Sequence, residues 1–207
     1  MTLTAPEVEQ LKHAPAVPGI LPVILQRWSP RSFAGRDVSR DDLRTLFEAA
    51  RWAASSFNEQ PWRFLVGTRG SETYSKIFES LGEFNQAWAK TAPVLILSAT
   101  KTTFSHNNSP NPVALYDLGA AGATLCYQAT ALGLHTHQMA GFDRDVARKL
   151  FTIPQDFMLG AVMALGYLGD PSALEMEGQR QQEVAPRSRK AVSEFVFSAW
   201  DQPADLG

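Results

Sequence analysis

The ten residues from Ser55 to Phe64 read Ser-Ser-Phe-Asn-Glu-Gln-Pro-Trp-Arg-Phe and are the most informative part of the chain. A helical pattern precedes them, and an apolar run, 63–67, follows. Serine and asparagine favour turns because their side chains hydrogen-bond the nearby main chain. We therefore predict a polar loop, starting at Ala54, that leads from a helix into a strand. Its carbonyls and amides suit a flat, hydrogen-bonding ring.

Arginines stand near both ends of the chain. Residues 27–31 read Arg-Trp-Ser-Pro-Arg, and Arg187 and Arg189 follow far downstream. Arginine presents fixed, bidentate donors that suit phosphate, and a serine hydroxyl adds a neutral donor. If the fold brings the two ends together, Arg27, Ser29, Arg187 and Arg189 can hold a phosphate dianion. If it does not, they are solvated surface side chains.

Composition restricts the class of protein. The chain has 207 residues, which predicts one domain, and a hydrophobic fraction of 44% permits a real core. A net charge of −2 gives no general attraction to nucleic acid or to an anionic membrane, and neither partner is expected. The single cysteine, Cys126, excludes an intrachain disulfide. No signal peptide or membrane span is expected, which predicts a cytoplasmic protein.

Hydrophobic periodicity predicts alternating helices and strands. Ser39 and Asp42 form a variant of the capping box ahead of an amphipathic helix of about 14 residues. Continuous apolar runs are typical of strands that are covered on both faces. Further helices are predicted at 20–27, 71–81, 113–132 and 144–151, and strands at 63–67, 93–99, 135–138 and 158–168. A sheet with covering helices is the favoured architecture.

Two apolar segments bear on assembly. Segment 113–132 is apolar nearly all round, with Asp117 as its only charge. Such a helix is buried in a core or at a subunit interface, and the sequence leaves both open. Residues 169–186 read as a polar linker, and the apolar stretch 193–200 reads as an extended arm.

The motifs at 27–31 and 55–64 resemble those of the FMN-dependent nitroreductase family, and the resemblance covers roughly residues 19–201. It implies an α+β three-layer sandwich with a central, mostly antiparallel sheet and flanking helices. It also implies an obligate homodimer in which each C-terminal arm crosses to the partner. On this basis residues 1–18 are an N-terminal extension, 19–186 the flavin-binding domain and 187–207 the arm.

The resemblance further implies a tight, non-covalent FMN site. Arg27, Ser29, Arg187 and Arg189 would contact the phosphate. Arg31 would place a cation near N1 and the C2 carbonyl of the reduced ring, and its alternative is a salt bridge to an acidic residue such as Asp37. The full set expected to contact FMN is Arg27, Trp28, Ser29, Arg31, Ala54, Ser55, Ser56, Asn58, Asn85, Met139, Ala140, Gly141, Arg187 and Arg189.

Several of these positions have distinct expected roles. In the family, the residues that match Ser55, Ser56 and Asn58 come from the second subunit, whereas Gln60 is expected to fix the shape of its loop. Asn85 aligns with an asparagine at the pyrimidine edge of the flavin. Some members carry a second basic residue three positions later, where this chain has Trp88.

Further expectations concern the segment 138–142, which matches a loop whose main-chain N–H groups face flavin N5 and O4. Gly141 would allow the main chain to approach closely.

By the same resemblance, the protein takes hydride from NADH or NADPH and reduces a flat acceptor such as a nitroaromatic or a quinone. Phe57 and Phe104 are the expected substrate contacts, the latter from a polar loop at 101–112. Ping-pong kinetics are expected because one open face of the flavin serves both substrates. No side-chain acid, base or nucleophile is expected, since the flavin carries the chemistry.

Two other functions stay open. One is a flavin-binding module without turnover, which Trp88 and Phe57 would favour if both crowd the open face. The other is a family offshoot with a narrow substrate, such as a dehalogenase or an enal reductase.

Other motifs predict no chemistry. His135 and His137 share a face of a strand but have no evident third ligand, so no metal site is expected. The glycines at 119 and 122 lack the third glycine and the strand-to-turn context of a dinucleotide fingerprint. Cys126 lies in an apolar helix and is expected to be an inert thiol.

Overall fold

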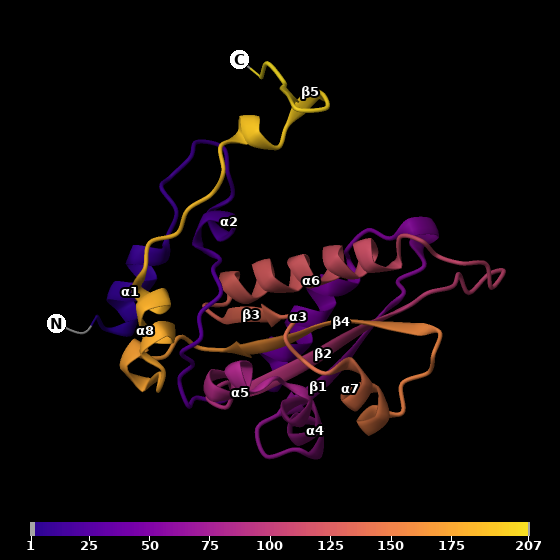
Figure 1. Cartoon of the computed structure of the whole chain (residues 1–207), viewed down its shortest axis with the longest axis horizontal. Helices are drawn as coiled ribbons and strands as arrows, with labels where there is room; N and C mark the ends of the chain where they lie inside the picture. The colour runs from indigo at the N-terminus through magenta and orange to yellow at the C-terminus, as the bar shows by residue number, and fades with distance from the viewer. Residues whose placement is uncertain (1–2, 207) are drawn as a thin grey trace.

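A four-stranded antiparallel sheet forms the centre of the computed structural model, which describes residues 3–206 (Figure 1). Every neighbouring pair of strands is antiparallel. The spatial order is β1 (Trp62–Thr68), β2 (Val94–Lys101), β4 (Phe157–Gly166) and β3 (His135–Met139). The central strand β2 is buried on both faces, as its continuous apolar run predicts.

Helices cover both faces of the sheet, so the molecule has three layers (Figure 1). One core cluster joins the sheet to α3 (Arg40–Arg51) and α6 (Ala114–Ala131). The other joins the opposite face to α4 (Glu72–Ser80), α5 (Glu83–Ala89) and α7 (Arg144–Phe151). The predicted α+β architecture is confirmed.

Most predicted elements are present within a few residues of their expected ends. The helix expected at 20–27 is α2 (Pro22–Gln26), and Arg27 follows directly as its C-cap. The predicted cap of α3 is confirmed, since Ser39 Oγ accepts a hydrogen bond from the N–H of Asp42 at 2.9 Å.

The segment 169–186 is more structured than the polar linker that the sequence predicts. The polar linker contains a short 3₁₀ turn, η2 (Pro171–Ala173), and a helix, α8 (Glu177–Val184). The buried residues of α8 are the polar Gln179 and Glu183, so no apolar periodicity in the sequence predicts this helix. The extension at 1–18 contains another helix, α1 (Ala5–Lys12), which packs against α8.

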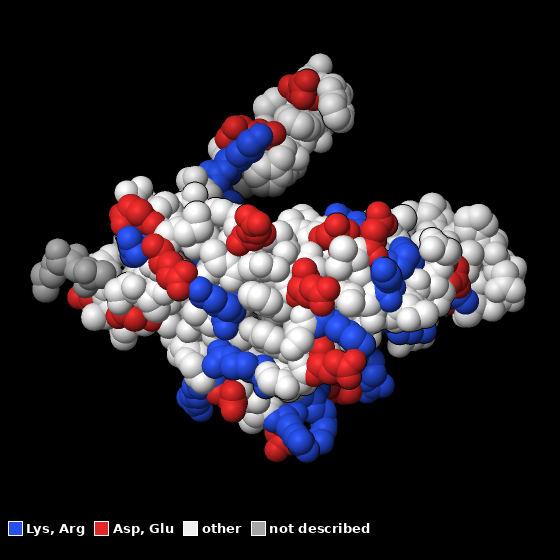
Figure 2. Space-filling view, turned by 60° about the horizontal axis from the view of Figure 1, so that its bottom comes forward, with Lys and Arg blue, Asp and Glu red and all other residues white. Residues whose placement is uncertain are grey.

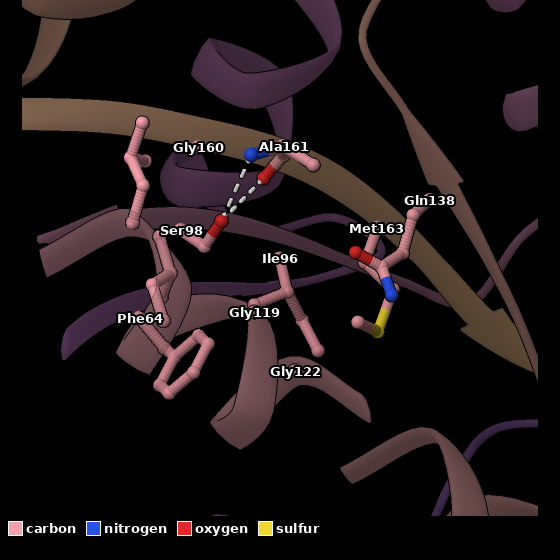
Figure 3. A pocket seen from close by; sticks show the side chains of 11 residues that line it. Phe64, Ile96, Ser98, Gly119, Gly122, Gln138, Gly160, Ala161 and Met163 are labelled. Atoms are coloured by element: carbon pink, nitrogen blue, oxygen red, sulfur yellow. Dashed lines mark hydrogen bonds between the residues drawn. The ribbon is translucent and has the colours of Figure 1, made fainter. Parts of the chain in front are cut away.

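Strands β2 and β4 meet at a bulge beneath α6. Ser98 Oγ accepts from the N–H of Ala161 at 3.0 Å and donates to its carbonyl oxygen at 2.8 Å (Figure 3). Gly160 beside it has no room for a side chain, because a Cβ would lie 2.6 Å from Leu118 Cδ2. A largely apolar cavity of about 190 Å³ lies here, with Gln138 at its polar end (Figure 3).

The C-terminal arm projects away from the three layers (Figure 1). It contains the turn η3 (Val192–Glu194) and a small hairpin of β5 (Phe197–Ala199) and β6 (Gln202–Pro203). Phe195 is 59% exposed and Trp200 is 87% exposed. The arm therefore presents an unburied aromatic surface.

The charged side chains of both signs are mixed on one face of the molecule (Figure 2). Within residues 3–206, no helix has the length and apolarity needed to cross a bilayer.

Candidate functional site

Segments 25–29 and 187–189, far apart in the sequence, meet at a cluster of guanidinium groups. Arg187 Nη1 donates a 2.6 Å hydrogen bond to the main-chain oxygen of Arg27, and Nη2 donates to that of Leu25. Arg27 Nη1 in turn lies 3.3 Å from Ser29 Oγ. The structure thus brings together the early and late segments that the sequence singles out.

The electrostatics of this cluster favour an anion. Burial lowers the pKa of Arg187, and the like charges of Arg189 and Arg27 lower it further, while Glu9 opposes them. Like charges disfavour one another in a partly desolvated site, and a bound anion relieves that cost. The group at 27, 29, 187 and 189 has the donor chemistry of a phosphate site.

Three buried donors near this cluster have no hydrogen-bond partner among residues 3–206. They are Trp28 Nε1, Arg31 Nε and Arg187 Nε. Buried polar groups are normally paired, so unpaired donors on neighbouring segments fit a site made for phosphate or carbonyl oxygens. The alternative role for Arg31 is not found, since the described residues include no ion pair between Arg31 and Asp37.

The loop that follows α3 is strained. Phe57 and Asn58 have φ values of +53° and Gln60 of +48°, in the left-handed region that side chains seldom adopt. Such strain persists only where the surroundings enforce it, and it clusters at functional sites.

Two contacts hold the loop in this shape. Ser55 Oγ accepts from the N–H of Gln60 at 3.0 Å, and Gln60 Nε2 donates to Asn58 Oδ1 at 3.1 Å. Gln60 therefore fixes the loop, as expected from sequence.

A third anchor is Asp117, which sequence reasoning did not assign to the site. Its carboxylate lies in the first turn of α6, is 3% exposed and accepts from the N–H of Ser56 at 3.1 Å. The signal in the sequence was a lone charge in an otherwise apolar helix. A buried carboxylate in such a helix requires a partner, and the loop supplies it.

Asn85 contacts the loop that follows β3. Asn85 Nδ2 donates to the main-chain oxygen of Gly141 at 2.8 Å, and the N–H of Gly82 donates to the same oxygen at 3.1 Å. A Cβ at Gly141 would lie 2.7 Å from Asn85 Nδ2. Within the described chain, no group accepts from the N–H of Ala140 or Gly141. Both N–H groups are therefore free to donate to a ligand.

Each of the paired histidines has a protein partner. His135 Nε2 lies 2.8 Å from a carboxylate oxygen of Glu9. His137 Nδ1 lies 2.9 Å from the carbonyl oxygen of Pro30, so Nδ1 carries the proton. Burial lowers the pKa of His137 to about 4, against the hydrogen bond to Pro30. The described residues contain no group of three or more metal-ligating side chains.

Trp88 does not lie over an open face. Its side chain is 0% exposed and lies between Phe33, whose ring centroid is 6.3 Å away, and His137, at 4.5 Å. The condition that would favour a binding module without turnover, Trp88 exposed beside Phe57, is not met in the structure, because the Trp88 ring fills the core.

Phe57 and Phe104 form an aromatic cluster with His106. Phe57 is 81% exposed and meets the buried Phe104 edge to face, with centroids 5.5 Å apart. His106 lies 5.7 Å from the first ring and 5.4 Å from the second. Glu59 Oε1 accepts from the N–H of Ser105 at 2.9 Å and ties this loop to the strained one.

Comparison with known proteins places the chain in a family. The family model described as the nitroreductase family matches residues 24–84 and 68–167. A crystal structure described as an oxidoreductase containing FMN is 36% identical, with a TM-score of 0.83 over 89% of this chain and 94% of that one. Protein DrgA of Synechocystis sp. is 30% identical over 173 residues, covering 69% of this chain and 81% of that protein. The chain therefore belongs to the nitroreductase family.

Proposed function

We propose that the protein is an NAD(P)H-dependent oxidoreductase that binds FMN non-covalently, with the phosphate on Arg27, Ser29, Arg187 and Arg189. The observation that carries the proposal is the convergence of these guanidinium groups, to none of which a carboxylate of residues 3–206 is bonded. The FMN in the similar crystal structure supports it. So does a relative from Aliivibrio fischeri, 35% identical over 75 residues and named major NAD(P)H-flavin oxidoreductase.

Other polar groups of the predicted site suit the ring of FMN. Arg31 would stabilise negative charge near N1 and the C2 carbonyl, and Asn85 would face the pyrimidine edge. The N–H groups of Ala140 and Gly141 suit N5 and O4, because a main-chain donor does not depend on the side chain. When bound, FMN supplies hydride acceptance and electron delivery, while these residues bind, orient and tune it.

A homodimer completes this proposed site. Ser55, Ser56 and Asn58 would reach the flavin of the second subunit, and the C-terminal arm would cross to it. Exposed apolar side chains support this: Tyr116 on α6 is 80% exposed, and Trp200 on the arm is 87% exposed. Sedimentation equilibrium tests it, since a dimer that dissociates when residues 191–207 are removed is expected and a full-length monomer contradicts the proposal.

The acceptor would be a flat molecule such as a nitroaromatic or a quinone. Phe57 and Phe104 offer apolar and edge-to-face contacts of the kind that aromatic rings favour. Ping-pong kinetics follow if one face of the flavin receives both substrates in turn. A cytoplasmic location accords with the supply of NADH and NADPH there.

Rapid mixing tests the proposed function. The purified protein is expected to be yellow, to lose its flavin absorbance when mixed anaerobically with NADH or NADPH, and to regain it with a nitroaromatic or a quinone. A colourless protein that takes up no FMN contradicts the proposal. A flavin that neither nicotinamide bleaches would indicate a binding module without turnover, for which the buried Trp88 gives no support.

A further inference from the structure

A buried carboxylate supports the segment that carries Trp28, Ser29 and Arg31. Glu183 on α8 is 1% exposed. Its Oε1 accepts from the N–H of Arg31 at 2.9 Å and from the N–H of Ser32 at 3.0 Å, and its Oε2 accepts from Arg31 at 3.0 Å. These bonds fix the main chain at Arg31 and so restrict the direction in which its side chain leaves the segment.

A buried lysine from α1 reaches the same place. Lys12 is 5% exposed, and its Nζ donates to the main-chain oxygen of Gln182 at 3.0 Å and to that of Ala185. The ammonium group also lies 5.1 Å from the ring centroid of Trp28, which allows a cation–π contact. Lys12 thus joins α1 to the end of α8 and to the proposed FMN-binding segment.

The two buried charges compensate each other. Burial lowers the pKa of Lys12, Glu183 opposes that shift, and Arg187 and Arg31 add to it. Burial likewise raises the pKa of Glu183 against its hydrogen bonds and the charges of Arg31 and Lys12. Removing one member of such a pair leaves an uncompensated buried charge, which is far more costly than the pair itself.

We propose that Glu183 and Lys12 are positioning residues that hold Arg31 and Trp28 in place for FMN. Through Lys12, helix α1 would then contribute to FMN binding. The inference rests on the proposed function. Neither residue contacts the flavin in this account, and both lie outside residues 24–167, which the family model matches. Without the Glu183 carboxylate, the N–H groups of Arg31 and Ser32 lose their acceptor, and the main chain at 28–32 becomes more mobile.

If Glu183 only stabilises the fold, another buried polar residue of α8 should affect FMN binding equally when it is replaced. Helix α8 offers such a residue as a matched control. Gln179 lies one turn before Glu183, is also 1% exposed and donates from Nε2 to the main-chain oxygen of Phe84 at 3.1 Å. Gln179→Met removes a buried polar contact of the same helix and leaves 28–32 untouched. Glu183→Gln retains one oxygen for both N–H groups but removes the charge, and Glu183→Ala removes both.

Three measurements test the proposal. They are amide hydrogen exchange in flavin-free protein, the Kd for FMN and the midpoint potential of the bound flavin. In Glu183→Ala, the N–H groups of Arg31 and Ser32 lose their charge-assisted hydrogen bonds, so we expect faster amide exchange at these two residues. With Arg31 no longer held in place, we expect FMN affinity to fall by about tenfold or more and the midpoint potential of the bound flavin to become more negative. In Lys12→Met and Glu183→Gln, all three readouts should change in the same direction as in Glu183→Ala, but by less. Gln179→Met should leave all three readouts unchanged.

Two results overturn the positioning role. One is unchanged exchange at Arg31 and Ser32 in Glu183→Ala. The other is an FMN affinity and a potential that shift no further in Glu183→Ala than in Gln179→Met. A wild-type protein that binds no FMN would instead contradict the proposed function, and the exchange data would still decide whether Glu183 holds the segment.

Discussion

Arg187 and Arg27 are joined by a 2.6 Å hydrogen bond across 160 residues of sequence. The bond runs from the guanidinium of Arg187 to the main-chain oxygen of Arg27, so the late arginine fixes the segment that carries the early one. A site whose donors are held before the ligand arrives loses less conformational entropy on binding. This bond would therefore preorganise the proposed phosphate site.

Arg187→Gln is expected to weaken FMN binding about tenfold to a hundredfold, because it removes a partly buried charge and the bonds that hold 25–27. Fluorescence titration of FMN measures this change. Arg44→Gln on α3 is the control, since that side chain is 80% exposed and lies in a surface ion pair. Equal affinity of Arg187→Gln and wild type would contradict the assignment.

Asp117→Ala is expected to release the strained loop, because the N–H of Ser56 loses its acceptor. We expect faster amide exchange at 55–60 and an FMN affinity lower by about tenfold. Thr100→Val is the control: it removes a buried hydroxyl that bonds the carbonyl of Ala114 at 3.1 Å and touches no part of the loop. If both variants lower FMN affinity equally, the loss reflects stability alone and the anchoring role is wrong.

Gly141→Ala is expected to displace Asn85, since the new Cβ would lie 2.7 Å from its Nδ2. The hydrogen bond of Asn85 to the main chain would break, and FMN affinity should fall about fivefold, the effect of one neutral hydrogen bond. Gly178→Ala on α8 is the comparison, because its Cβ would meet nothing within 4 Å. An unchanged Kd in Gly141→Ala would remove Asn85 from the proposed site.

The pH dependence of stability should report His137. Burial lowers its folded pKa to about 4 from 6.5, so between these values the unfolded chain binds a proton that the folded chain does not. The stabilisation is fully present above about pH 6.5 and is lost as the pH falls to about 4, by roughly 3 kcal/mol in total.

Urea denaturation at pH 7 and pH 5 measures this effect. At pH 5 the wild type should have lost roughly 2 kcal/mol more than His137→Asn relative to pH 7. His106→Gln, in an exposed loop, should behave as wild type. The same pH dependence in His137→Asn and wild type would show that other groups control it.

Sequence alone predicted the parts of the fold whose physics is local. The apolar run of β2 and the pattern and cap of α3 mark their elements without help from the rest of the chain. The convergence of Arg27 with Arg187 followed only from resemblance, because nothing in either segment encodes contact across 160 residues.

The features that the sequence did not predict depend on contacts between residues that are distant in the chain. Helix α8 buries Gln179 and Glu183, which are polar, so its inward face looks like a solvated one in sequence. Trp88 stood where some relatives have a cation, but only the packing of Phe33 and His137 shows that it belongs to the core. Asp117 was visible as a lone charge, although its partner Ser56 was not.

Comparing the affinities of FMN and riboflavin tests the central claim most directly, because the two ligands differ only in the phosphate. Titration of flavin-free protein should show FMN binding about a hundredfold or more tighter, and Arg187→Gln should remove most of that difference. Equal affinity of the wild type for FMN and riboflavin would contradict a phosphate site built from Arg27, Ser29, Arg187 and Arg189.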